Sequence, residues 1–232
     1  MSAGTAPRAA APLIDQLARL IESTYDIDSG TVPLGRFVVG DLGHARLTAG
    51  RRVRQAIGHD GRGAAVLLRP LEDGERWAAA VYLPDALVLH LERHDPRRTL
   101  SDANADAFAA LVEEVDHLVT IAERSGSGAA TTLLELEWHA AVTKYLVLAH
   151  FAGRLSGRPL DAAARAFVEG HVFHRAEFND PDPAIRARYR EAHRLGYRFV
   201  RDLARRPAEE RVARLRRFHR ASAREKLERY AG

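Results

Sequence analysis

Two glutamate–histidine pairs stand out among the residues of this sequence that could do chemistry. Glu113 and His117 are four residues apart, and Glu135 and His139 repeat that spacing. Residues four apart project from one face of an α-helix, so each pair can present a carboxylate and an imidazole together. Such pairs on facing helices hold metal ions in carboxylate-bridged helical bundles. The four residues are therefore a candidate site for iron, manganese or zinc, and Glu114 adds an E-x-x-H spacing of its own.

Two features of the same residues favour a different interpretation. At about 100° per residue, Glu113 and His117 point about 160° away from the apolar stripe of their helix. That direction favours either a solvated helix face whose charges form surface salt bridges or a second contact surface. The four-helix di-iron pattern also needs two further carboxylates and a second E-x-x-H, which the sequence lacks. Both interpretations, metal site and helix surface, stay open.

Glu137 and Lys144 are a second candidate, as acid/base groups of an enzyme. They are seven residues apart, so they share one side of a helix that is apolar nearly all round. Buried ionisable groups cluster at functional positions. The alternative is that both side chains pair with arginines of neighbouring helices and fix the packing register.

The C-terminal part of the chain is strongly basic. Residues 185–229 contain 16 Arg and Lys against 6 Asp and Glu, a balance of +10 in a chain of net charge +4. Guanidinium forks suit both phosphate and carboxylate. The rest of the chain carries −6, so the alternative is that this basic face docks on the protein's own acidic half. The residues that could form an anion- or partner-binding face are Arg190, Arg194, Arg198, Arg201, Arg205, Arg214 and Arg217.

The first elements expected from the pattern are a helix and a small antiparallel sheet. Apolar residues at helical spacing, short alternating runs and turn residues mark them. The strands we expect are residues 36–39, 64–68 and 76–83, the last two joined by the turn 72–75, and the flanking helices are residues 12–25 and 84–94.

Helices dominate from residue 101 onward. We expect the first to be capped by Ser101 or Asp102, and the second, residues 131–154, to be central because it is apolar nearly all round. Later helices begin at Asp161, at Asp182-Pro183 and at Pro207. The prediction is an α+β, mostly helical fold, in which a small N-terminal antiparallel sheet packs on a C-terminal array of about five helices.

The predicted organisation is one compact domain over residues 12–229 after a disordered tail, residues 1–11. Within it, residues 12–95 form the helix and sheet region, and residues 101–229 form the helical region. A chain of this length can bury a sizeable core without disulfide or metal staples.

Bulk composition excludes several classes of function. The chain has no cysteine, which rules out disulfides, thiolate zinc sites, iron–sulfur clusters and a cysteine nucleophile. It also has no P-loop, G-x-G-x-x-G, H-E-x-x-H or G-x-S-x-G motif. No apolar run approaches the ~18 residues of a membrane helix, and the N-terminal run is too short for a signal peptide. We therefore expect a cytoplasmic protein without a membrane partner.

The segment 108–145 resembles a family of uncharacterised bacterial proteins. The likeness lies in Glu113-x-x-x-His117, Leu133-Leu-Glu-Leu-Glu137 and Lys144-Tyr145. The sequence departs from the family at Glu114, where the family has a small residue, and at Trp138-His139, where it has an amide-bearing pair. The departures favour the other candidates over His139, and the resemblance implies no activity.

Three functions follow from these observations. The sequence favours a regulatory or interaction protein without catalytic activity, which binds a protein partner through the basic arginine face or the central helices. The first alternative is a metal-dependent enzyme, di-iron-like or hydrolytic, built on the glutamates and histidines of those helices. The second is a nucleic-acid-binding protein that uses the basic C-terminal helices.

Overall fold

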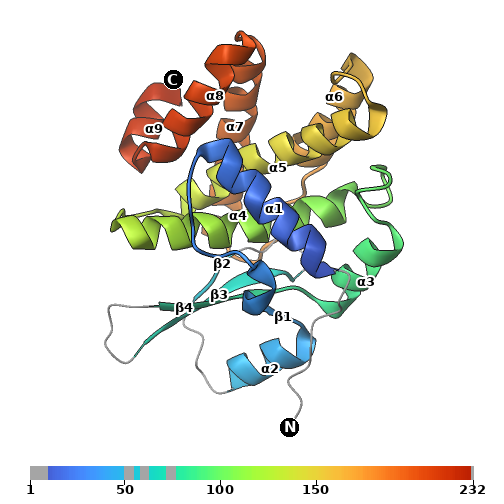
Figure 1. The fold of residues 1–232 in the computed structure, drawn as a ribbon. Helices are drawn as coiled ribbons and strands as arrows, with labels where there is room; N and C mark the ends of the chain where they lie inside the picture. Colours follow the sequence, from blue (N-terminus) through green and yellow to red (C-terminus); the bar gives the residue numbers. More distant parts are fainter. Residues whose placement is uncertain (1–9, 50–54, 58–62, 72–76, 231–232) are drawn as a thin grey trace.

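The structure is a computed structural model that describes residues 10–49, 55–57, 63–71 and 77–230 (Figure 1). Most of the predicted tail and the predicted turn at 72–75 lie outside these residues, and helix α1 already begins at Ala10. The described part is a mostly helical α+β fold, as predicted. One cluster of buried hydrophobic side chains runs through both the sheet region and the helical region.

A four-stranded sheet forms the N-terminal region together with α1 and α3. Its spatial order is β1-β4-β3-β2, and β2–β3 and β3–β4 pair antiparallel. Strand β3 begins with four consecutive buried residues, which indicates cover on both faces, and α4 packs against β3 and β4. The strands are β1 Val38–Val39, β2 Gln55–Ile57, β3 Ala65–Pro70 and β4 Trp77–Tyr82.

The edge strand β1 departs from the prediction of a purely antiparallel sheet, because it runs parallel to β4. After β1 the chain forms the exposed helix α2 and then the antiparallel strands β2 and β3 before it enters β4. Strands β1 and β4 therefore run in the same direction. The strand expected at 36–39 also starts late. A 3₁₀ turn occupies Leu34–Phe37, where Leu34 is buried and its backbone N–H donates to Asp15 Oδ1 at 2.7 Å.

The remaining elements are helical. Several starts agree with the sequence: the side chains of Thr132, Asp161 and Asp182 each accept a backbone N–H at the start of a helix. The helices are α1 Ala10–Tyr25, α2 Asp41–Ala49, α3 Asp85–Arg93, α4 Ala105–Ser127, α5 Leu133–Ser156, α6 Ala162–Glu169, the π-helix η2 Gly170–His174, α7 Pro183–Ala204, α8 Ala208–Arg220 and α9 Ala223–Tyr230.

Helix α4 starts later than expected, and neither Ser101 nor Asp102 caps it. Asn104 is its cap residue, although its side chain makes no capping bond to the helix. That side chain instead accepts the N–H of Ser101 and donates to the carbonyls of His94 and Thr99. These bonds hold residues 94–104 as a compact turn before the helix.

Helices α4 and α5 form the centre of the molecule (Figure 1). Helix α4 lies between the sheet on one side and α5 on the other, and α7 packs along α5. Gly196 allows the close approach of α7, since a Cβ atom there would lie 3.0 Å from the Cβ of Ala141. Polar residues on α4 that face away from the sheet are therefore covered by α5.

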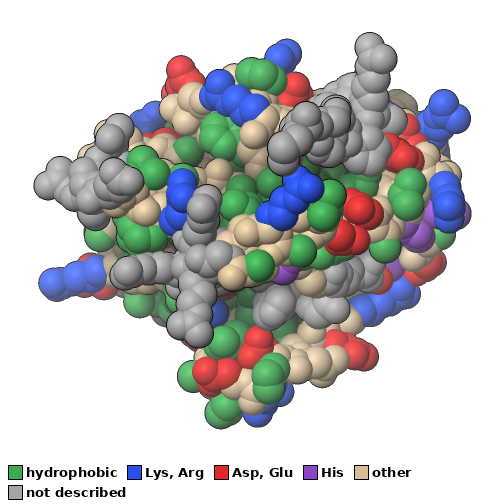
Figure 2. Space-filling view, turned by 90° about the horizontal axis from the view of Figure 1, so that it is seen from below, with side chains coloured by type: hydrophobic (Ala, Val, Ile, Leu, Met, Phe, Trp, Pro, Cys, Tyr) green, Lys and Arg blue, Asp and Glu red, His purple; other side chains and the backbone are tan. Residues whose placement is uncertain are grey.

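The outer surface differs from side to side. Figure 2 views the molecule from the sheet side, where basic and acidic side chains are interspersed with hydrophobic ones. The arginine-rich helices α7, α8 and α9 lie at the opposite end, at the top of Figure 1. Among the described helices, none is long and apolar enough to cross a bilayer.

Candidate metal centre

Five ionisable side chains meet between α4 and α5. Glu113, Glu114 and His117 come from α4, and Glu137 and Lys144 come from α5; each is at most 7% exposed. We call these five residues the Glu113 cluster. Of the two interpretations of the face that carries Glu113 and His117, the solvated face is wrong and the second contact surface is correct, because α5 covers that face of α4. A single helix pattern does not reveal a second covering helix.

The geometry of the Glu113 cluster leaves several polar atoms without hydrogen bonds. Lys144 Nζ contacts Glu113 Oε2. His117 Nε2 lies 3.6 Å from Glu137 Oε2, and His117 Nδ1 lies 3.7 Å from Glu114 Oε2. Both distances exceed a hydrogen bond. Within the described residues, both nitrogens of His117, Glu114 Oε2 and Glu137 Oε1 are buried without a hydrogen-bond partner.

Three members of the cluster are arranged as metal ligands. Glu113, His117 and Glu137 each offer one ligand atom, and these atoms all lie within 4.8 Å of one another. We call these three residues the ligand triad. Two carboxylates and one imidazole form a donor set that suits zinc, iron or manganese. Two of these three residues, Glu113 and His117, were predicted from the sequence as metal ligands. Glu137 was predicted as an acid/base group.

Electrostatics in the Glu113 cluster favour protons at two positions when no metal is present. Burial raises the pKa of Glu114 to about 8, so this carboxyl is neutral near pH 7. Burial alone lowers the pKa of His117, but the charge of Glu137 and the neighbouring Glu114 side chain outweigh it and hold that pKa well above its usual range. A cationic His117 then lies between Glu137 and the neutral carboxyl of Glu114.

Glu135 and His139 do not join the triad, so the predicted four-residue metal site is not formed. Glu135 Oε1 accepts a hydrogen bond from Lys226 Nζ at 2.6 Å, and His139 Nδ1 lies 2.8 Å from Asp116 Oδ2. The reason is helix geometry: positions 135 and 137 differ by about 200° around α5, so their side chains leave on opposite sides. Glu137 lies on the side of α5 that faces His117.

The side chains of Glu135 and His139 belong to a second buried group, which we call the His139 cluster. His219 Nδ1 lies 3.0 Å from His139 Nε2, and Arg124 lies 3.7 Å from Glu135. Its members are Asp116, Arg124, Glu135, His139, His219 and Lys226. Sequence reasoning missed Asp116, His219 and Lys226. The sequence held one signal for Lys226, because the chain has only two lysines. In the structure both lysines pair with buried glutamates of the central helices.

A cavity of about 440 Å³ leads to the Glu113 cluster. Glu113 and Lys144 form part of its wall, together with the π-helix η2 and α7. His193 faces the same cavity; burial and the charge of Lys144 lower its pKa to about 3, so its imidazole is neutral. Single π-turns occur frequently at functional sites. We call this space the Glu113 cavity.

The predicted arginine face is divided in the structure. Arg198, Arg201, Arg205 and Arg214 line a cleft on α7 and α8, whereas Arg194 pairs with Glu191 on the surface at 2.7 Å. Arg190 and Arg217 are exposed. The protein's own acids take up part of the basic charge, because Asp26 pairs with Arg216 and Arg220 and Asp202 pairs with Arg206 and Arg214.

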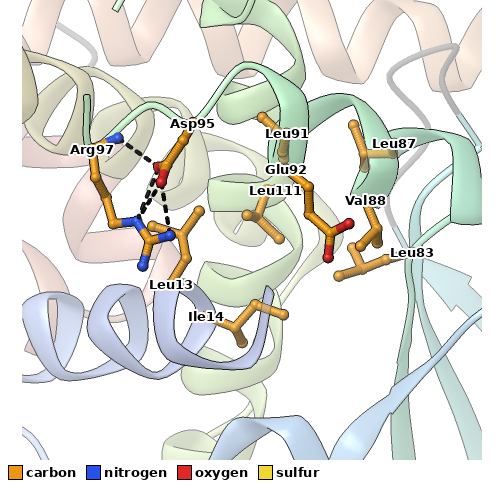
Figure 3. A pocket seen from close by; sticks show the side chains of 10 residues that line it. All are labelled: Leu13, Ile14, Leu83, Leu87, Val88, Leu91, Glu92, Asp95, Arg97 and Leu111. Atoms are coloured by element: carbon orange, nitrogen blue, oxygen red, sulfur yellow. Dashed lines mark hydrogen bonds and ion pairs between the residues drawn. The ribbon is translucent and has the colours of Figure 1, made fainter. Parts of the chain in front are cut away.

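A small apolar pocket between α1, α3 and α4 is distinct from these polar groups (Figure 3). It measures about 60 Å³ and is lined mainly by leucines, with the Asp95–Arg97 ion pair at its edge. Its lining brings no histidine and no group of converging carboxylates. The pocket therefore suits an apolar group and not a reaction centre.

Comparisons with known proteins leave the site to be interpreted from its geometry. No family model matches the chain, and no curated protein or solved structure matches it.

Proposed function

We propose that this protein binds a divalent transition metal at Glu113, His117 and Glu137 and acts as a metal-dependent enzyme. The observation that carries the proposal is the convergence of three buried ligand atoms within 4.8 Å of one another. The Glu113 cavity is the proposed route for the substrate, since Glu113 belongs both to the triad and to the cavity wall.

The state of His117 is the strongest support. Its side chain is fully buried, yet neither ring nitrogen has a hydrogen bond within the described residues. A buried polar atom without a partner costs about 1–3 kcal/mol. One nitrogen of His117 would regain that interaction by binding a metal ion, and Glu113 and Glu137 would be the carboxylate ligands whose charge the ion offsets.

Three protein ligands leave room in the coordination sphere for water or substrate, as in catalytic metal sites. A metal there acts as a Lewis acid on a bound water or on a substrate oxygen. Lys144 contacts Glu113 and positions its carboxylate. Glu114, neutral at pH 7, lies 3.7 Å from His117 Nδ1 and can donate a proton there.

The test is metal content of the purified, untagged protein by inductively coupled plasma mass spectrometry. We expect near-stoichiometric zinc, iron or manganese, lost in the double variant His117→Gln, Glu137→Gln, which keeps side-chain size. The matched control is His174→Gln, Glu177→Gln, which changes an exposed histidine and an exposed glutamate that do not belong to the ligand triad. Equal metal in all three proteins, or none after loading with each metal, contradicts the proposal.

Three expectations from the sequence stay predictions beside this one: a protein partner, a cytoplasmic location and kinship with the uncharacterised bacterial family. Nucleic-acid binding through the basic helices also stays a prediction.

A further inference from the structure

A second cleft, remote in sequence from the ligand triad, gathers five guanidinium groups. It measures about 420 Å³ and is formed by the C-terminal half of α7 with α8 and α9. We call it the arginine cleft. Its lining residues are Tyr197, Arg198, Phe199, Arg201, Asp202, Arg205, Arg214, Arg229 and Tyr230.

The arginine cleft carries a large excess of positive charge. Its lining has five arginines and one carboxylate, Asp202. That carboxylate is already neutralised, because it lies 2.5 Å from Arg214 and 3.2 Å from Arg206. Acids outside the lining pair with arginines both inside and outside the cleft, as Glu225 does with Arg229 at 3.1 Å and Glu191 does with Arg194 at 2.7 Å. Five guanidinium groups against the two carboxylates of Asp202 and Glu225 still leave the cleft with a net positive charge.

Aromatic rings hold two of the guanidinium groups in place. The guanidinium of Arg214 lies 4.9 Å from the centroid of Tyr230, and that of Arg201 lies 5.5 Å from the centroid of Tyr197. Arg201 also donates to the Tyr197 hydroxyl at 3.1 Å. Arg214 Nε is buried and lacks a hydrogen-bond partner within the described residues. Side chains already fixed lose little conformational entropy when a ligand binds.

The chemistry and size of the cleft indicate one class of ligand. Guanidinium forks bind phosphate oxygens in pairs, and several forks around one space suit a ligand with more than one phosphate. The volume falls in the range of small-molecule sites, about 300–1,000 Å³. An extended nucleic acid would instead need unpaired basic side chains along a longer surface. We propose that the arginine cleft binds a small polyphosphate ligand, such as a nucleoside triphosphate.

The test is isothermal titration calorimetry of the full chain with sodium tripolyphosphate and with adenosine triphosphate. All titrations contain a chelator, so the outcome does not depend on the proposed metal site. We compare the wild type with Arg198→Gln, Arg205→Gln, which removes two cleft charges. The matched control is Arg190→Gln, Arg194→Gln, which removes two charges from the same helix outside the cleft.

We expect saturable binding of tripolyphosphate that weakens about tenfold or more in the cleft variant and less than about twofold in the control. Equal weakening in both variants would mean general charge attraction and overturn the proposal. So would the absence of saturable binding at low salt. Tight binding of a 20-base-pair DNA duplex without binding of tripolyphosphate would also overturn it, in favour of a nucleic-acid surface. Circular dichroism of all variants confirms that each is folded.

Discussion

The buried ion pair between Lys226 and Glu135 allows a sharp test of how the C-terminal helix is held. Lys226 in α9 is 1% exposed, Glu135 in α5 is 3% exposed, and Lys226 Nζ donates to Glu135 Oε1 at 2.6 Å. Burial lowers the pKa of Lys226 to about 8, so the lysine is largely charged at pH 7. Replacing Lys226 with methionine keeps the packing of the stem and leaves the carboxylate without this partner.

The expected cost follows from the burial of the partner. Removing one member of a buried ion pair costs about 3–5 kcal/mol, because the remaining charge is uncompensated. Arg124 lies 3.7 Å from Glu135 and provides partial compensation, so we expect the lower end, about 3 kcal/mol. For a chain of this size that corresponds to a fall in Tm of about 6–12 °C.

Urea denaturation at pH 7, followed by circular dichroism, measures the free energy of unfolding. The double variant Lys226→Met, Glu135→Met removes both charges and should recover most of the loss. Arg224→Met is the matched control on the same helix; its pair with Glu228 is exposed, and we expect a change within about 0.5 kcal/mol. A loss below about 1 kcal/mol for Lys226→Met, or no recovery in the double variant, would show that the unpaired charge of Glu135 is not what destabilises the variant.

Three further predictions concern stability. Burial and the neighbouring cationic groups lower the pKa of His219 to about 2. Below pH 6.5 the unfolded chain therefore binds a proton at His219 that the folded chain does not bind. The free energy of unfolding falls as the pH decreases through this range, by about 1.4 kcal/mol per pH unit. The slope between pH 6.5 and 4.5, measured by denaturation, should be shallower in His219→Gln, and an unchanged slope would exclude His219 as its source. Thr132→Ala removes the bond from the Glu135 N–H at 3.1 Å and should cost about 1 kcal/mol, while Thr132→Ser should keep most of it; equal losses would mean that the hydroxyl does not cap α5. Gly196→Val should cost about 1–3 kcal/mol by overpacking against Ala141, with a smaller cost for Gly196→Ala, and a neutral Val variant would contradict the close approach of α7 and α5.

Helix patterns predicted the architecture well where one signal dominated. The all-round apolar segment of α5 predicted a central helix, and the structure buries most of it. The Asp182-Pro183 start of α7 was equally clear, because the aspartate caps and proline fits the first turn. Short elements without strong periodicity, such as α2 and β2, went unpredicted, as did the separate helix α9.

The candidate site could be predicted only in part. The spacing of Glu113 and His117 placed them together correctly, but their angle to the apolar stripe did not decide between a solvated face and a second contact surface. A polar helix face is exposed to solvent only where no second element covers it. The periodicity of one helix gives no information about such an element. The choice between Glu135 and Glu137 as third ligand depends on the rotation of α5 relative to α4, and only the packed structure fixes it.

The most direct test of the metal proposal is anomalous X-ray diffraction from crystals grown with manganese, collected on both sides of the metal edge. We expect one strong peak between α4 and α5, about 2.0–2.3 Å from an oxygen of Glu113, an oxygen of Glu137 and a nitrogen of His117. An empty triad in crystals whose surface carboxylates hold manganese would contradict it.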